Sequence, residues 1–202
     1  MASRPPAFGD RRRRVIGLLG GSFNPAHAGH VHISVEALRR LGVDQVWWLV
    51  SPQNPLKPAD GMAPLADRMA SARRLTLHHR IIVTDMELRL GSTRTAAVLH
   101  ALNRRYPAMT FIWMMGADNL RQIPKWWRWS DIFTAARVAV FDRSPYSYRA
   151  LAGAAATKFA RSRKRNPRAL GCSNPPAWSY LAIRRHGASA TALRRAAQHV
   201  NK

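Results

Sequence analysis

The 202-residue sequence has a single cysteine, Cys172, and no acidic residue after Asp142. One cysteine can form neither an intrachain disulfide nor a cysteine-based zinc site, so we expect a reducing compartment. No apolar run approaches the roughly 18–20 residues that a membrane helix needs. The arginines at 11–14 have the outline of a twin-arginine export signal, but the apolar run after them is short and ends in a glycine pair. We therefore expect a cytoplasmic protein with no membrane partner.

Negative charge is scarce, and 33 basic against 10 acidic side chains give a formal net charge of +23. The last 60 residues carry +13 of this excess, because they contain no acid at all. Such a surface attracts polyanions through its long-range field. Arginine also outnumbers lysine 28 to 5, as the coding bias of a GC-rich genome would produce. Charge alone therefore names no partner, and an apolar fraction of 47% excludes a disordered polycation.

Short apolar runs that are typical of buried strands alternate with segments of helical spacing. We expect strands at 15–19, 46–50, 81–84, 110–115, 138–141 and 178–183. We expect helices at 29–41, 64–78, 95–106, 119–135 (broken at Pro124), 148–165 and 191–200. The alternation predicts an α/β fold, a Rossmann-like parallel sheet with helices on both faces. Residues 1–14 are expected to form a flexible basic tail and 15–202 a single domain, with a helical and loop subregion over about 143–202.

In open parallel sheets, ligands bind at the carboxyl ends of the strands, so the loops after Leu19, Val50 and Met115 are the informative ones. The first of these is the densest signal in the chain and reads GGSFNPAHAGH over residues 20–30. A glycine pair lets backbone amides approach a phosphate, and the loop then enters the amino end of a helix, which favours anions. His27 and His30 are three residues apart and can share one side of the first turn. Zinc is the competing interpretation, but no third ligand stands at metalloprotease spacing.

This string closely resembles the signature of the HxGH nucleotidyltransferases, in which His27, Gly29 and His30 match without change and Ser22 takes the usual Ser/Thr position. The resemblance implies that this segment orients the triphosphate of ATP for in-line attack on the α-phosphorus, without a covalent enzyme intermediate. Such chemistry depends on alignment and on neutralising the developing charge.

Near the end of the chain, SATALR over residues 189–194 resembles the family's second element, a hydroxyl-rich turn before a helix that carries an arginine. The resemblance implies phosphate contacts from Ser189, Thr191 and Arg194. A simple helix cap is the alternative for the two hydroxyls.

The middle of the chain resembles the bacterial nicotinate-mononucleotide adenylyltransferases, through GADNL at 116–120 and PKWWRW at 124–129. The resemblance implies that Trp126 stacks on a pyridine ring and that Asp118 lies in the nucleotide site. Trp127 and Trp129 are expected to be core residues. Thr95 is placed near the nicotinate carboxylate, although Arg94 replaces the family's tyrosine beside it.

The resulting hypothesis is transfer of AMP from ATP to nicotinate mononucleotide, with Mg²⁺ bound chiefly to the phosphates and no protein metal site. Two alternatives stay open: another acceptor, such as nicotinamide mononucleotide or phosphopantetheine, and a non-catalytic basic RNA-binding protein on the same fold. Nucleic acid is not the expected partner, and a homo-oligomer is left open. Expected site residues are, for catalysis, His27, His30 and Arg194; for ATP, Gly20, Gly21, Ser22, Phe23, Gly29, Gly116, Asp118, Ser189 and Thr191; and for the acceptor, Thr95, Trp126 and Lys57.

Overall fold

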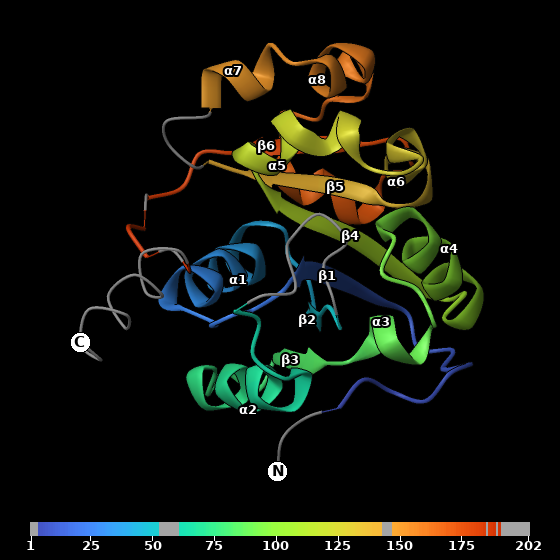
Figure 1. The fold of residues 1–202 in the computed structure, drawn as a ribbon. Helices are drawn as coiled ribbons and strands as arrows, with labels where there is room; N and C mark the ends of the chain where they lie inside the picture. The colour runs from blue at the N-terminus through green and yellow to red at the C-terminus, as the bar shows by residue number, and fades with distance from the viewer. Residues whose placement is uncertain (1–3, 53–60, 143–146, 185, 189, 191–202) are drawn as a thin grey trace.

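The computed structural model describes residues 4–52, 61–142, 147–184, 186–188 and 190, and its centre is one parallel sheet (Figure 1). Its six strands are β1 (Arg14–Gly21), β2 (Gln45–Val50), β3 (Ile81–Thr84), β4 (Met109–Gly116), β5 (Arg137–Phe141) and β6 (Trp178–Leu181). They lie in the order β3-β2-β1-β4-β5-β6, and every neighbouring pair is parallel. This is the doubly wound order in which the chain reverses direction across the sheet between β1 and β4. The predicted fold class is confirmed.

The helices are α1 (Ala28–Arg40), α2 (Leu65–Leu75), α3 (Met86–Arg89), α4 (Thr95–Arg105), α5 (Ala117–Gln122), α6 (Trp129–Ala135), α7 (Ser147–Leu151) and α8 (Ala154–Lys158). Short 3₁₀ turns add η1 (Ile123–Lys125), η2 (Ala160–Ser162) and η3 (Pro167–Cys172). Buried residues of α1, α2 and η3 pack on one face of the sheet, and those of α3, α4, α5, α6 and α8 pack on the other. Helices therefore cover both faces, as expected.

The strands are apolar along their whole length because each of them contributes side chains to both faces. In β2, Trp47 belongs to the core layer beneath α4 and α6, whereas Trp48 belongs to the layer beneath α1 and α2. Both indoles are fully buried. The two core layers therefore lie on opposite faces of the sheet.

Two expectations for secondary structure were wrong. The single basic helix expected at 148–165 is broken into α7, α8 and η2, because Gly153 takes an extended conformation (ψ 165°) and caps α8. The short helix α3 was not expected at all, since four residues carry too little periodicity to be recognised. The helix expected at 191–200 lies outside the described residues.

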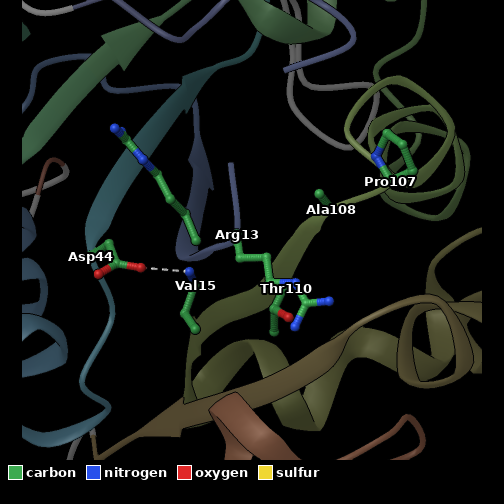
Figure 2. Close-up of a pocket in the computed structure, with 7 residues that line it drawn as sticks. Arg13, Val15, Asp44, Pro107, Ala108 and Thr110 are labelled. Carbon is green, nitrogen blue, oxygen red and sulfur yellow. Dashed lines mark hydrogen bonds between the residues drawn. The ribbon is translucent and has the colours of Figure 1, made fainter. Parts of the chain in front are cut away.

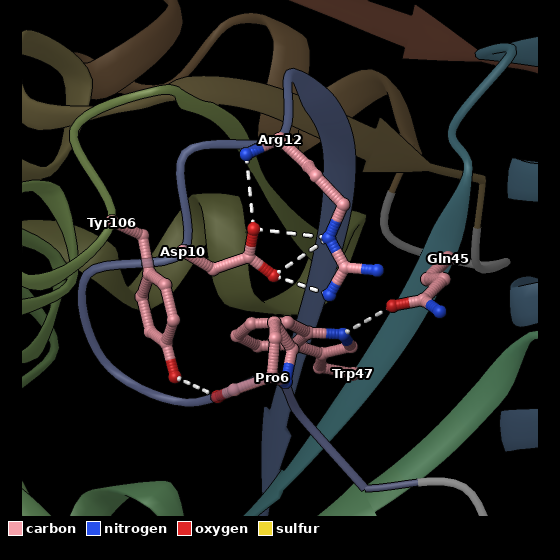
Figure 3. A network of polar contacts seen from close by, with 6 residues as sticks. All are labelled: Pro6, Asp10, Arg12, Gln45, Trp47 and Tyr106. Atoms are coloured by element: carbon pink, nitrogen blue, oxygen red, sulfur yellow. Dashed lines mark hydrogen bonds and ion pairs between the residues drawn. The ribbon is translucent and has the colours of Figure 1, made fainter.

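The segment before β1 is packed onto the protein from Pro6 onward (Figure 3). The Tyr106 hydroxyl donates to the Pro6 carbonyl at 2.8 Å. The rings of Phe8 and Tyr106 meet edge-on, with 5.6 Å between their centroids. The guanidinium groups of Arg89 and Arg105 lie 5.0 and 4.6 Å from the centroid of the Phe8 ring. These contacts join the segment to α3 and α4. The flexibility expected for residues 1–14, like the division into one domain and a subregion, stays a prediction.

None of the helices in the described part of the chain is both long enough and apolar enough to cross a bilayer.

Candidate active site

The loops expected to carry the chemistry begin side by side at the carboxyl edge of the sheet. Strand β1 lies between β2 and β4, with Gly21 paired to Val50 and Leu19 paired to Met114. The Ser51 amide donates to the Gly21 carbonyl at 2.9 Å, which continues the pairing one residue beyond β2. Neighbouring strands are about 4.8 Å apart, so groups from the three loops can meet one ligand.

The glycine pair ends β1 with a close approach to the core. A Cβ on Gly20 would lie 2.4 Å from the Trp113 ring of β4, so only glycine fits there. Phe23, two residues beyond the pair, is buried and has a left-handed backbone (φ 47°). Its ring stacks on Trp48 with 5.0 Å between centroids. The buried ring anchors a tight turn whose backbone stays at the edge of the sheet, as a phosphate-binding loop requires.

The two histidines are held against each other at the start of α1. Their ring centroids are 3.8 Å apart, and His27 caps the helix with an extended backbone. The backbone N–H of His27 donates to Nδ1 of His30 at 3.1 Å. When His30 is neutral, its proton therefore resides on Nε2, a position from which it can donate. The structure thus brings this predicted pair together at a helix amino terminus.

Gly29 leaves room for both a histidine and the C-terminal segment. A Cβ there would lie 2.9 Å from His27 Nδ1 and 3.3 Å from the Ala188 carbonyl oxygen. His32 on α1 binds the Arg184 carbonyl oxygen through Nε2 at 2.7 Å. The chain that leads to the second expected motif therefore runs along the amino-terminal half of α1. Ser189, Thr191 and Arg194 themselves lie outside the described residues, as does Lys57.

Two of the residues predicted for ATP and two of those predicted for the acceptor lie on the β4 side of the edge. Gly116 is buried at the end of β4, and Asp118 is half-buried in the first turn of α5. Thr95 opens α4, and Trp126 is half-buried against the core after η1.

The tryptophans beside Trp126 differ from one another. Trp129 packs edge-on against two core rings, those of Phe133 and Phe159, as expected. Trp127 was expected in the core, which is wrong: its side chain is 46% exposed, and the guanidinium groups of Arg94 and Arg128 lie 4.9 and 5.4 Å from its ring. The Arg94 contact joins the turn before α4 to the segment that carries Trp126, so the predicted acceptor residues are on adjoining segments.

Two charged residues of this edge escaped sequence analysis. Arg68 of α2 is only 3% exposed and donates to carbonyl oxygens in the loops after β1 and β2. Glu87 of α3 is 5% exposed; burial raises the pKa of its carboxyl group to about 7, against a smaller opposite effect of a hydrogen bond with Ser51. Glu87 lies in a helix of four residues, which is too short to show a buried face in the sequence. Arg68 stands on the same face of α2 as Ala72, and this spacing is the one sequence signal of its burial. Arg137 lies at the start of β5 and donates to the Ser173 carbonyl at 2.6 Å.

A hollow of about 480 Å³ lies at the opposite, amino edge of the sheet (Figure 2). Its lining includes Arg13, Arg14, Asp44 and Thr110. The Asp44 carboxylate accepts a hydrogen bond from the Val15 amide at 2.7 Å. This hollow lies at the strand ends where ligands of such sheets do not bind. Within the described ranges, no group of three or more His, Cys, Asp or Glu side chains could hold a metal ion.

These features define a nucleotide-binding α/β protein, and the chain belongs to the cytidylyltransferase-like family, whose model matches residues 18–196. Within that family it belongs to the nicotinate-nucleotide adenylyltransferases. It is 51% identical over 180 residues to a probable nicotinate-nucleotide adenylyltransferase of Cereibacter sphaeroides, covering 89% of this chain and 96% of the relative. A protein of the same name from Roseobacter denitrificans is 48% identical over 186 residues, 91% of this chain and 93% of its own.

The fold is also similar to that of Plasmodium falciparum nicotinic acid mononucleotide adenylyltransferase complexed with NaAD. The TM-score is 0.66 at 16% identity, covering 91% of this chain and 83% of the other. At this identity the likeness concerns the fold alone.

Proposed function

We propose that this protein transfers the adenylyl group of ATP to nicotinate mononucleotide, giving nicotinate adenine dinucleotide and pyrophosphate. The observation that carries the proposal is the paired histidines at the start of α1, directly after a glycine turn at the carboxyl edge of the sheet. The relatives that share about half of this sequence carry the name of the same activity.

In the proposed reaction, a phosphate oxygen of the acceptor forms a bond to the α-phosphorus of ATP. The bond from that phosphorus to the bridging oxygen of the β-phosphate breaks, and pyrophosphate leaves. The backbone of the Gly20–Phe23 turn and Nε2–H of His30 donate to phosphate oxygens, whose negative charge grows as the bond breaks. His27 sets the position of the His30 ring through its backbone N–H. No side chain has to form a covalent bond.

The acceptor is proposed to lie between the β2 and β4 sides of the edge. Trp126 would stack on the pyridine ring and Thr95 would approach its carboxylate, while Lys57 would reach a phosphate. Asp118 and Gly116 are proposed to contact the nucleotide. Ser189, Thr191 and Arg194 would close over the triphosphate, consistent with the position of Ala188 against Gly29.

ATP-dependent nucleotidyl transfer generally uses a divalent cation, and we propose Mg²⁺. The described side chains provide no protein cage for such an ion, whereas the triphosphate supplies oxygen ligands of the kind Mg²⁺ prefers. When bound, the cation neutralises phosphate charge.

The test is product identification with ATP labelled at its α-phosphate. We expect the label in nicotinate adenine dinucleotide and one pyrophosphate released for each dinucleotide formed. His30→Ala should lower kcat by at least about a hundredfold, the scale of losing one donor to developing charge. The exposed His100→Ala on α4 is the matched control and should leave kcat unchanged. Label found only in free AMP, or a His30→Ala rate near that of the wild type, would contradict the proposal.

A further inference from the structure

Arg68 is a buried guanidinium that binds two loops of the candidate site, the loop after β1 and both ends of the loop between β2 and α2. Nη1 donates to the carbonyl oxygens of Ser22 at 2.6 Å and Ser51 at 2.8 Å. Nη2 donates to the Pro52 carbonyl at 2.9 Å, and Nε donates to the Ala63 carbonyl at 2.8 Å. Four of its five N–H groups are accounted for by these bonds. One side chain therefore fixes the turn after β1, the end of β2 and the entry to α2 relative to one another.

Among the described residues, no carboxylate neutralises the charge of Arg68. None of the ion pairs among the described residues includes it, and burial lowers the pKa of its guanidinium. Burying an unpaired charge is costly, and four carbonyl dipoles offset only part of that cost. An apolar residue of similar length would avoid the buried charge but would leave the four carbonyl oxygens without this donor. The arrangement therefore indicates a use for the charge.

The bond to Ser22 reaches the phosphate-binding turn directly. The Ser22 carbonyl and the Phe23 N–H belong to one peptide unit, and only the Asn24–Pro25 and Pro175–Pro176 bonds are cis in the described chain. In a trans unit the two groups point in opposite directions. With its carbonyl fixed on the guanidinium, the unit presents the Phe23 N–H away from Arg68. Hydrogen bonding at one end of a peptide also polarises the other, which makes that N–H a stronger donor.

We infer that Arg68 is a positioning residue for adenylyl transfer, orienting and polarising the Ser22–Phe23 peptide toward the triphosphate while holding the ends of the β1 and β2 loops in register. This inference rests on the proposed function. Arg68 acts through backbone groups and does not itself touch the substrates. Its positive charge adds to the field of the α1 amino terminus.

The experiment compares full-length Arg68→Met and Arg68→Lys with Arg74→Met, which removes an exposed guanidinium from the same helix. Circular dichroism and thermal unfolding establish that each variant is folded. Calorimetric titration with ATP alone, without acceptor, then measures binding. Steady-state kinetics give kcat and both KM values separately.

Arg68→Met is expected to bind ATP at least about tenfold more weakly and to lose at least about a hundredfold in kcat, as displacement of reacting groups by about 1 Å does. Arg68→Lys should lie between it and the wild type, since an ammonium group cannot reach all four carbonyl oxygens of the two loops. Millimolar guanidinium should restore part of the activity of Arg68→Ala. Arg74→Met should match the wild type in both measurements.

The inference is overturned if folded Arg68→Met binds ATP and turns over as Arg74→Met does, which would leave Arg68 a purely structural residue. If Arg68→Met does not fold, unchanged ATP affinity and kcat in Arg68→Lys overturn it instead. A wild-type protein that binds ATP but adenylylates no nicotinate mononucleotide would refute the proposed function, while the ATP titrations would still decide the role of Arg68.

Discussion

Glu87 gives the protein a pH-dependent stability that a single substitution should remove. Its carboxyl group is 5% exposed at the carboxyl edge of the sheet, and burial raises its pKa from 4.5 to about 7 despite a hydrogen bond with Ser51. The folded protein therefore holds a proton that the unfolded chain releases near pH 4.5. Between these two pKa values the folded state binds more protons, so the free energy of unfolding falls as pH rises.

The size of the effect follows from the two pKa values. A difference of about 2.5 pKa units at about 1.4 kcal/mol each corresponds to roughly 3 kcal/mol, present in full below pH 4.5 and lost above about pH 7. For a chain of this size that is roughly 6–12 °C in Tm. Glu87→Gln keeps the shape and cannot ionise. Its amide N–H groups need partners and lower the stability by a similar amount at every pH, so the cost cancels when two pH values are compared.

The assay is urea unfolding of wild type and Glu87→Gln at several pH values from 5 to 8. The stability difference between them should change by about 2.5 kcal/mol across this range, in favour of the glutamine variant at high pH, because part of the full effect is already lost at pH 5. Asp67→Asn, at an exposed carboxyl on α2, should show no such change. Parallel pH profiles for wild type and Glu87→Gln would refute the reasoning, because they would mean that Glu87 titrates alike in the folded and unfolded chains.

Three further substitutions test other parts of the account. Gly20→Ala places a Cβ 2.4 Å from a buried indole and should cost about 1–3 kcal/mol in urea unfolding, whereas Gly171→Ala, with its nearest contact at 3.7 Å, should cost far less. Tyr106→Phe removes the hydrogen bond to Pro6 and should cost about 1 kcal/mol by the same assay; no change would mean that water replaces the bond. Trp126→Ala should raise the KM for nicotinate mononucleotide at least about tenfold and leave that for ATP unchanged. An equal rise in both KM values would make Trp126 a packing residue.

Sequence was sufficient for the sheet and for the segment of residues 20–30. Buried parallel strands are apolar runs bounded by turn residues, so their positions could be read with errors of one or two residues at the ends. The paired histidines follow from helical spacing, since residues three apart share a side of a helix. The Ala188 carbonyl oxygen lies close to Gly29, which is consistent with the expectation that the motifs at 20–30 and 189–194 bind the same triphosphate.

Sequence was insufficient where long-range packing decides a residue's surroundings. Arg68 shares the buried face of α2 with Ala72, four residues on, whereas Arg73 and Arg74 are exposed. Helical spacing could place Arg68 on that face, but its carbonyl partners come from two distant loops that only the fold brings together. Trp127 lies between η1 and α6 and is exposed, whereas Trp129 begins α6 and packs against core rings. Composition alone does not distinguish the two positions. The basic C-terminal third remains without an assigned ligand beyond nucleotide phosphates.

The most direct test of the central claim is the ratio of kcat/KM for nicotinate mononucleotide to that for nicotinamide mononucleotide, measured with saturating ATP by pyrophosphate release. The two acceptors differ only in a carboxylate and an amide, so the ratio reports whether the site recognises the acid. We expect kcat/KM for nicotinate mononucleotide to exceed that for nicotinamide mononucleotide by at least about tenfold, the scale of one specific polar contact. Equal values for the two acceptors, or turnover of phosphopantetheine in their place, would contradict it.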